Sequence, residues 1–245
     1  MKKLFLTNEV FLQDQTICVD GEVHHHLANV LRVKVGEEFI VGDLNNTEFV
    51  GKIAKIEKKA TFIKLVSEYK REKSYIPSVT LFFPILKGDK VDDIVRMCSE
   101  IGVTNFVPVI TNNCIVKINE ENSKNKIKRW QTIAKESSMQ SGRFEIPKIF
   151  PITKLNDIEN FAIDSLKIVG LIEKKNEYLI NILNKNKNFD RISLLMGPEG
   201  DFTFDEIKFL KDNFWRGVTL SSNILRSETA IIFTVSSLFF VLGVG

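Results

Sequence analysis

Cysteine is scarce in this sequence, with only 3 among its 245 residues. Cys18, Cys98 and Cys114 lie far apart and form no C-x-x-C pair, so the sequence indicates neither a zinc site nor a disulfide framework. Three adjacent histidines at 24–26 do not change this, because neighbouring residues on a helix point about 100° apart and cannot converge on one ion. No metal site is predicted.

Long hydrophobic runs are also missing. The most apolar segment, 231–245, contains Thr234, Ser236 and Ser237 and is shorter than the ~20 residues that a membrane-spanning helix needs. The N-terminal MKKLFLTNEV has too short an apolar run for a secretory signal peptide. We therefore expect a cytoplasmic protein without a membrane anchor, in which 231–245 forms a core helix.

No large excess of one charge is present either. The formal net charge is +3, which is too small to prove a nucleic-acid partner but permits one if the basic residues cluster. With 44% hydrophobic and 27% charged residues, the composition is that of a folded globular protein and excludes a disordered chain. The length suffices for two domains.

Short apolar runs separated by turn signals fill the first 70 residues or so. They lie at 3–6, 17–19, 38–41, 49–56 and 61–66. This spacing predicts a small, mostly antiparallel β-barrel or sandwich, with one helix at 24–30. The charged stretch 67–76 precedes Pro77 and marks a boundary, so the predicted domains are 1–72 and 73–245.

From Val79 onwards the pattern changes to alternating strands and helices. Strands are predicted at 79–86, 106–110, 166–172, 192–196 and 218–220, and helices around 91–98, 124–141 and 178–183, after Thr203, and at the C-terminus. Thr203 and Glu206 have the capping-box spacing. The alternation predicts an α/β domain whose mostly parallel sheet is covered on both faces. Asn- and Lys-rich pieces at 119–128 and 184–190 are predicted as surface loops.

Two loops follow the last two predicted strands. The first contains Gly-Pro-Glu-Gly at 197–200 and the second begins at Leu220. We expect them at the carboxyl ends of neighbouring strands, where ligands bind in open α/β sheets. From the first loop alone an ordinary tight turn is the favoured interpretation, and neither common phosphate-binding fingerprint is present.

Together, GPEGDFTFDEI and LSSNILRSETA resemble the paired C-terminal motifs of the SPOUT methyltransferases, in particular the RsmE-type family that methylates N3 of a uridine in small-subunit ribosomal RNA. Asp201 stands where that family usually has a second glycine, and 221–223 where it usually has Gly-Pro-Arg. The stretch HHHLANVLRVKVGEEFIVGD resembles the family's PUA-like N-terminal domain. The resemblance implies a SPOUT-type, mostly parallel sheet with a C-terminal trefoil knot, preceded by a small PUA-like β-barrel.

The resemblance also implies that S-adenosylmethionine lies in the knot, held by three loops that follow successive strands. Mapped residue by residue, the cofactor-binding set would be Leu171, Ile172, Glu173, Met196, Gly197, Pro198, Glu199, Gly200, Leu220, Ser221, Ile224 and Leu225. Methyl transfer from a sulfonium is an in-line displacement, so the protein must hold donor and acceptor close together and needs no metal.

The uracil N3 must lose a proton before it attacks. A carboxylate can take that proton, and an arginine can stabilise the anion. Arg226 and Glu228 are the candidates beside the second loop, together with Arg143, which ends a segment similar to the family's Glu-x-x-x-Gln-Ser-x-Arg. From the residues alone, an ion pair or a helix-end charge explains them equally well.

Basic residues suggest where RNA binds. The candidates are Arg32, Lys34, Lys55, Lys58, Lys59, Gln140 and Arg143. For the lysines a solvated surface is a serious alternative. The last helix is apolar nearly all round, which predicts a homodimer. The expected function is methylation of uridine N3 in 16S ribosomal RNA; the alternatives are a SPOUT enzyme for another RNA and a non-catalytic RNA-binding protein of ribosome assembly.

Overall fold

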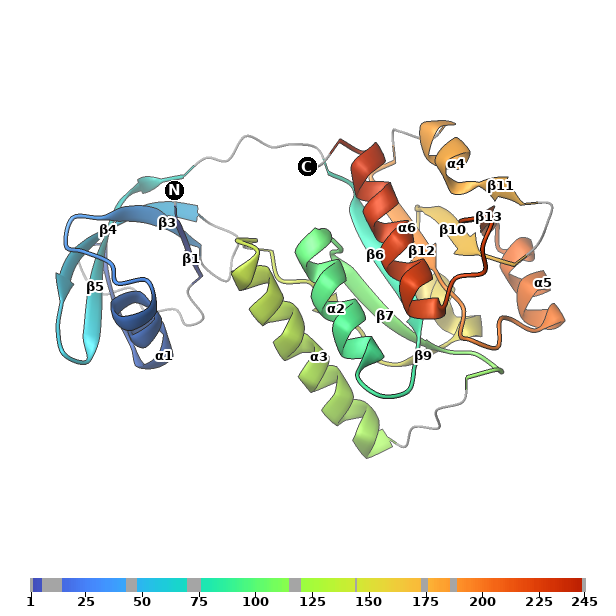
Figure 1. Cartoon of the computed structure of the whole chain (residues 1–245), viewed down its shortest axis with the longest axis horizontal. Coiled ribbons are helices and arrows are strands. Elements are labelled where there is room, and N and C mark those ends of the chain that lie inside the picture. Colours follow the sequence, from blue (N-terminus) through green and yellow to red (C-terminus); the bar gives the residue numbers. More distant parts are fainter. Residues whose placement is uncertain are drawn as a thin grey trace. The chain divides into compact units, whose positions relative to one another are not determined.

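The computed structural model describes residues 2–5, 15–42, 48–69, 76–114, 120–143, 145–172, 176–185 and 189–243. The chain forms two compact units, one of Met1–Ser74 with Gly142–Glu145 and the other of Tyr75–Ser141 with Ile146–Gly245 (Figure 1). Each unit has its own sheet and its own hydrophobic core. No helix within the described ranges is both long and apolar enough to cross a membrane.

The first unit is a five-stranded sheet. Its strands are β1 (Lys2–Phe5), β2 (Thr16–Asp20), β3 (Glu38–Gly42), β4 (Glu48–Ile56) and β5 (Ala60–Glu68), in the spatial order β1-β3-β4-β5-β2. All pairs are antiparallel except β1 with β3. The mostly antiparallel β prediction is thus confirmed.

The helical part of this unit consists of α1 (Gly21–His25), which continues into a turn of π-helix, η2 (His26–Val30). Leu27 packs into the core of the unit with Ile17, Phe39 and Ile63. His24 is buried, and its Nδ1 lies 2.9 Å from Thr61 Oγ1, so a hydrogen bond accounts for this histidine. No cluster of three metal-ligating side chains occurs among the described residues.

The second unit contains an eight-stranded sheet. Its strands are β6 (Ser78–Pro84), β7 (Asn105–Ile110), β8 (Lys148–Ile149), β9 (Thr153–Lys154), β10 (Leu166–Gly170), β11 (Glu177–Tyr178), β12 (Arg191–Leu195) and β13 (Arg216–Thr219). The order is β11-β13-β10-β12-β6-β7-β8, with β9 also paired to β7, and every pair is parallel. Parallel sheets are buried on both faces, and β6 and β12 are accordingly buried at every position after their first residue.

Helices cover both faces of this sheet. The helices are α2 (Lys90–Ile101), α3 (Glu120–Gln140), the 3₁₀ helix η3 (Leu155–Phe161), α4 (Leu179–Lys185), α5 (Phe204–Asp212) and α6 (Ser227–Val241). Leu81 and Phe83 of β6 pack on the side of α2, α3, α4 and α6, whereas Phe82 packs with η3 and α5. Alternate side chains of one strand thus enter two cores, and the predicted α/β architecture is confirmed.

One loop prediction is wrong. Residues 120–128 are not a surface loop, because α3 begins at Glu120; residue 119 lies outside the described part of the chain. Glu121 stands in the first turn, where the helix dipole favours acidic side chains. Of the predicted loop at 184–190, residues 184 and 185 complete α4, and 186–188 lie outside the described residues.

Candidate active site

A pocket of about 670 Å³ lies at the carboxyl edge of the parallel sheet. Three loops form it, those that follow β10, β12 and β13, with further contacts from Asn176, Tyr178 and Ala230. Its size lies within the range of roughly 300–1,000 Å³ that small-molecule sites have. The expectation that two neighbouring strands carry the site is wrong, because β10 pairs with both β12 and β13 and lies between them.

The loop after β12 folds back tightly at Gly197. A Cβ atom at this position would lie 2.9 Å from Cε2 of Phe202, so a side chain here would collide with the aromatic ring. The carbonyl oxygen of Gly197 accepts a hydrogen bond of 2.7 Å from Ser227 Oγ. This bond joins the loop after β12 to the first turn of α6.

Asp201 follows this turn with a φ of +56°, in the left-handed region that favours glycine. Its Oδ1 accepts a bond of 2.8 Å from the backbone N–H of Phe202. Asn113, from the loop after β7, donates to the carbonyl oxygens of Gly200 and Asp201, both at 2.9 Å. An aspartate thus takes the left-handed conformation where the resembling family usually has glycine, and a neighbouring loop holds it there.

The downstream end of this loop is held by a capping box. Thr203 Oγ1 accepts from the backbone N–H of Glu206, and Glu206 Oε2 accepts from the backbone N–H of Thr203. Glu206 Oε1 also accepts a bond of 2.8 Å from the backbone N–H of Asn112. The predicted capping box is confirmed, and its glutamate additionally binds the loop after β7.

The walls of the pocket are largely apolar. Leu171 and Met196 are buried beneath it, whereas Ile172 and Ile224 line it although they are 62% and 78% exposed. In the loop after β13, Ser221 Oγ accepts a bond of 3.1 Å from the backbone N–H of Asn223. This bond forms a local turn at the positions where the resembling family usually has Gly-Pro-Arg.

Lys90, the first residue of α2, joins two acidic residues beside the pocket. Its Nζ lies 3.0 Å from Glu199 Oε1 and 3.2 Å from Glu228 Oε1, and these hydrogen bonds raise the pKa of Lys90. Burial raises the pKa of Glu199, but the hydrogen bond from Lys90 and a backbone hydrogen bond outweigh it, so the pKa lies below its ordinary value. The sequence did not point to Lys90, because no motif contains it.

Most of the predicted cofactor-binding residues come together in this pocket. Those that line it are Leu171, Ile172, Met196, Gly197, Pro198, Glu199, Leu220, Ser221, Ile224 and Leu225. Gly200 belongs to the loop but does not line the pocket, and Glu173 lies outside the described residues. Residues outside the predicted cofactor set also line the pocket, among them Gly170, Asn176 and Thr219. Gly170 and Thr219 could have been found from their places at the ends of β10 and β13.

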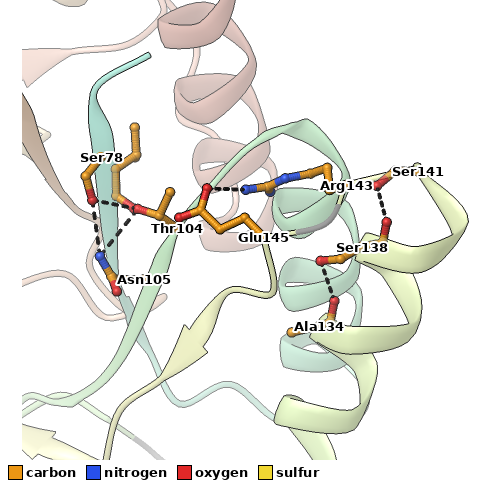
Figure 2. A network of polar contacts seen from close by, with 9 residues as sticks. Ser78, Thr104, Asn105, Ala134, Ser138, Ser141, Arg143 and Glu145 are labelled. Carbon is orange, nitrogen blue, oxygen red and sulfur yellow. Dashed lines mark hydrogen bonds and ion pairs between the residues drawn. The ribbon is translucent and has the colours of Figure 1, made fainter. Parts of the chain in front are cut away.

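The predicted catalytic residues are placed differently from one another. Arg226 is the N-cap residue of α6 and lines the pocket. Glu228 stands in the first turn of α6 but faces Lys90 and is not among the lining residues. Arg143 belongs to the first compact unit, where its guanidinium lies 4.0 Å from the carboxylate of Glu145 (Figure 2).

Gln140 ends α3 at the edge of the second unit opposite to the pocket. Because β7 and β8 are parallel, the helix between them must run from the carboxyl edge back to the amino edge. Figure 2 shows the last turn of this helix, in which Ser138 Oγ donates to the carbonyl of Ala134 at 2.8 Å. It also shows Ser78 and Asn105, the first residues of β6 and β7, at the amino edge. Asn105 Nδ2 donates a hydrogen bond of 3.4 Å to Ser78 Oγ.

The predicted RNA-binding residues within 1–72 are all exposed. They are Arg32, Lys34, Lys55, Lys58 and Lys59. Lys58 and Lys59 stand in the turn between β4 and β5, and Lys55 Nζ pairs with Glu57 at 2.5 Å.

Comparisons with known proteins agree with the two units. A family model described as an RNA methyltransferase domain matches residues 72–239, and one described as an RNA methyltransferase PUA domain matches residues 19–66. Ribosomal RNA small subunit methyltransferase E 2 of Borreliella burgdorferi is 30% identical over 96% of both chains. Ribosomal RNA small subunit methyltransferase E of Bacillus subtilis is 28% identical over 95% of this chain and 93% of its own.

Two solved structures have similar folds. Ribosomal RNA small subunit methyltransferase E of Neisseria gonorrhoeae, bound to S-adenosyl methionine, has a TM-score of 0.80 and 26% identity, with 98% of both chains covered. A putative methyltransferase of Legionella pneumophila in complex with the cofactor SAM has a TM-score of 0.79 and 26% identity, covering 97% of this chain and 96% of its own.

Proposed function

The chain belongs to the RNA methyltransferase family, and from this premise we propose that it transfers the methyl group of S-adenosylmethionine to N3 of a uridine in 16S ribosomal RNA. The observation that carries the proposal is the three-loop pocket at the carboxyl edge of the sheet, which ten of the twelve predicted cofactor-binding residues line. The relatives of matching length act, by their names, on small-subunit ribosomal RNA.

The residues of the pocket fit S-adenosylmethionine. Leu171, Met196 and Ile224 offer an apolar wall for a flat base, and the tight turn at Gly197 brings backbone groups to the pocket surface. Glu199 places a carboxylate beside a ligand whose sulfonium and ammonium groups carry positive charge. When bound, the cofactor supplies an electrophilic methyl group.

The chain's own residues have to orient the uracil and manage its charge. Arg226 lines the pocket at the start of α6, where its guanidinium can stabilise the negative charge that spreads over the uracil oxygens after deprotonation. Glu199 is a poor proton acceptor at neutral pH, because its pKa is lowered. Glu228 stays a candidate for the general base, although its carboxylate pairs with Lys90 at 3.2 Å.

Two measurements test the proposal. Calorimetry with S-adenosylmethionine is expected to show uptake; a lack of uptake would favour a non-catalytic RNA-binding protein. Mass mapping of ribosomal RNA from a deletion strain is expected to show loss of one N3-methyluridine, restored by the purified protein and cofactor. Modification of another RNA, with 16S RNA unchanged, would favour the alternative SPOUT enzyme.

We also propose that residues 1–72 bind RNA and 73–245 carry out catalysis, in the cytoplasm and with the C-terminal chain knotted as the family resemblance implies. Replacing Lys55, Lys58 and Lys59 by alanine should weaken RNA binding and flatten its salt dependence, since fewer counterions are released. Uptake of S-adenosylmethionine should stay the same. An unchanged slope of log K against log[salt] would indicate that these lysines are only a solvated surface and do not contact RNA.

An apolar groove between α4 and α6 supports the proposed homodimer. It encloses about 470 Å³ and is lined by Tyr178, Leu179, Ile180, Leu183, Leu220, Phe233, Ser236, Ser237, Phe240 and Val241. Phe233 and Phe240 are 44% and 86% exposed, and a second copy would cover them. Light scattering should give a dimer mass, and Phe240→Lys should give a monomer. A monomeric wild type at micromolar concentration would contradict the proposal.

A further inference from the structure

We propose that one face of α3 is a docking surface for the phosphate backbone of the substrate RNA, separate from the lysines of the first unit. The face consists of Lys124, Lys128, Gln131 and Lys135 and is called the lysine face below. The proposal rests on the proposed function, because the occupant it commits to is ribosomal RNA.

The four side chains share one side of the helix. At about 100° per residue their directions fall within about 60° of one another, and at 1.5 Å per residue Lys124 and Lys135 are about 16 Å apart along the axis. With Ile127 and Thr132 they line a shallow groove of about 450 Å³. Three ammonium groups in a row along a groove match a polyanion. Gln131 between them is bonded inside the unit, to the carbonyl of Pro147 and the N–H of Ile149, so the lysines supply the charge of this face.

Among the side chains that the structure describes, which do not include that of Glu120, no carboxylate lies within 4.0 Å of Lys124, Lys128 or Lys135. Other basic residues of α3 are used inside the unit. Arg129 pairs with Asp92 of α2 and with Asp89, the N-cap residue of that helix, and Lys126 lies 5.9 Å from the ring centre of Trp130. The segment 122–129 has four basic residues and no acidic one. Unlike Arg129, the lysines of this face thus have no ion pair among the described side chains.

The amino half of α3 also extends beyond the helix on which it packs. Both α2 and α3 start at the carboxyl edge of the sheet, and Asp92, in the first turn of α2, binds Arg129 and Trp130, about ten residues into α3. Roughly nine residues of α3, or about 13 Å, thus precede this contact. Figure 1 shows this end of α3 reaching past the start of α2.

This extension lies on the same edge of the sheet as the pocket. Lys90, two residues before Asp92, bonds to Glu199 of the pocket, so the start of α2 stands between the pocket and α3. A structured RNA that places one uridine in the pocket must pass over this edge, where Lys124 and Lys128 can neutralise its phosphates. These contacts would add affinity without reading sequence.

The test compares two variants of equal charge. Lys124→Ala/Lys128→Ala removes two ammonium groups from the lysine face, and Lys208→Ala/Lys211→Ala removes two from α5 as the matched control. Binding of 16S ribosomal RNA transcribed in vitro is measured over a range of salt concentrations. The first variant should reduce the slope of log K against log[salt] by about 1.4–1.8, since each lost phosphate contact removes about 0.7–0.9; the control should leave it nearly unchanged.

A second readout separates docking from chemistry. In the first variant KM for RNA should rise, while kcat at saturating RNA, uptake of S-adenosylmethionine and the melting temperature stay at wild-type values. Equal slopes in the two variants would overturn the inference, and would also be the result if the face bound an acidic protein instead. If the wild type takes up cofactor but methylates no nucleotide, the proposed function fails, and the slopes still report whether α3 binds RNA.

Discussion

Replacing Asp201 by alanine and, separately, by glycine tests how the pocket loop keeps its path without a second glycine. Asp201 has a φ of +56°, and its carboxylate accepts a bond of 2.8 Å from the N–H of Phe202. Alanine removes the carboxylate and keeps the Cβ atom, whereas glycine removes both. The two variants therefore separate the side-chain bond from the backbone conformation.

The expected magnitudes follow from these two contributions. A left-handed conformation costs an ordinary residue about 1–2 kcal/mol, less for aspartate and nothing for glycine. The hydrogen bond to Phe202 contributes about 0.5–1.5 kcal/mol. Asp201→Ala should thus lose about 1–2 kcal/mol, whereas Asp201→Gly should stay within about 0.5 kcal/mol of the wild type. For a protein of this size a difference near 1 kcal/mol corresponds to about 2–4 °C in Tm.

Differential scanning calorimetry measures Tm, and titration with S-adenosylmethionine measures the affinity of the pocket for the cofactor. Asn113 binds backbone carbonyls at 200 and 201, so its hydrogen bonds remain available in both variants. Asp201→Gly should therefore keep the cofactor affinity of the wild type. Equal losses of Tm in the two variants, or a larger loss with glycine, would refute the reasoning, because the left-handed backbone would then not decide which residue fits.

Three further predictions concern the surroundings of the pocket. Arg226→Ala should keep the fold and the cofactor affinity but lower the rate of methyl transfer by a factor of roughly 10²–10³, and Arg226→Lys should restore it only in part. Single-turnover assays normalised to folded protein measure this rate, and a wild-type rate would remove Arg226 from the catalytic candidates. Lys90→Met should lower both cofactor affinity and Tm. The pKa of Glu199 is lowered and that of Lys90 is raised, so the Tm difference between wild type and Lys90→Met should be steady from above pH 4.5 to below pH 10.5. The difference should shrink in stronger acid as Glu199 is protonated, and in stronger alkali as Lys90 loses its proton. A difference that grows in acid would contradict the ion pair. Gly102→Ala should lower the free energy of unfolding, measured with urea, by roughly 2–6 kcal/mol, because φ is +143° and the new Cβ would lie 2.3 Å from the ring of Phe239. An unchanged free energy of unfolding would show that α6 can shift.

The five longer strands of the parallel sheet were predictable because burial on both faces makes them largely apolar runs. The two-residue strands β9 and β11 were not predicted, because they are too short to show such a run. The start of α3 was not, since Asn- and Lys-rich residues 120–128 lack the apolar spacing of a helix that packs along its whole length. This part of α3 is stabilised by tertiary contacts further along the helix, where Asp92 binds Arg129 and Trp130. The 3₁₀ helix η3 was not predicted for a similar reason. Its two buried apolar residues, Leu155 and Ile158, are too few to form a helical pattern, and they pack in the core on the face of the sheet that η3 covers.

The sequence could predict those parts of the site that lie within the two motifs. Residues 196–200 and 220–226 are contiguous stretches, so a resemblance transfers them as units. Lys90 is separated by 109 and 138 positions from the two carboxylates it binds, and Asn113 by 87 from Gly200. Such partners become visible only when the loops after β6, β7 and β12 are brought to one edge of the sheet.

The position of β10 explains how one pocket can be built from loops that are distant in the chain. If β12 and β13 were adjacent, their two loops would meet directly and leave a shallow crevice. Because β10 separates them, the loop at 171–172 forms a floor between two walls. The departures at Asp201 and 221–223 lie in those walls, and each has its own support, from Asn113 on one side and from the turn at Ser221 on the other. The walls can therefore vary in sequence while the cavity keeps its shape.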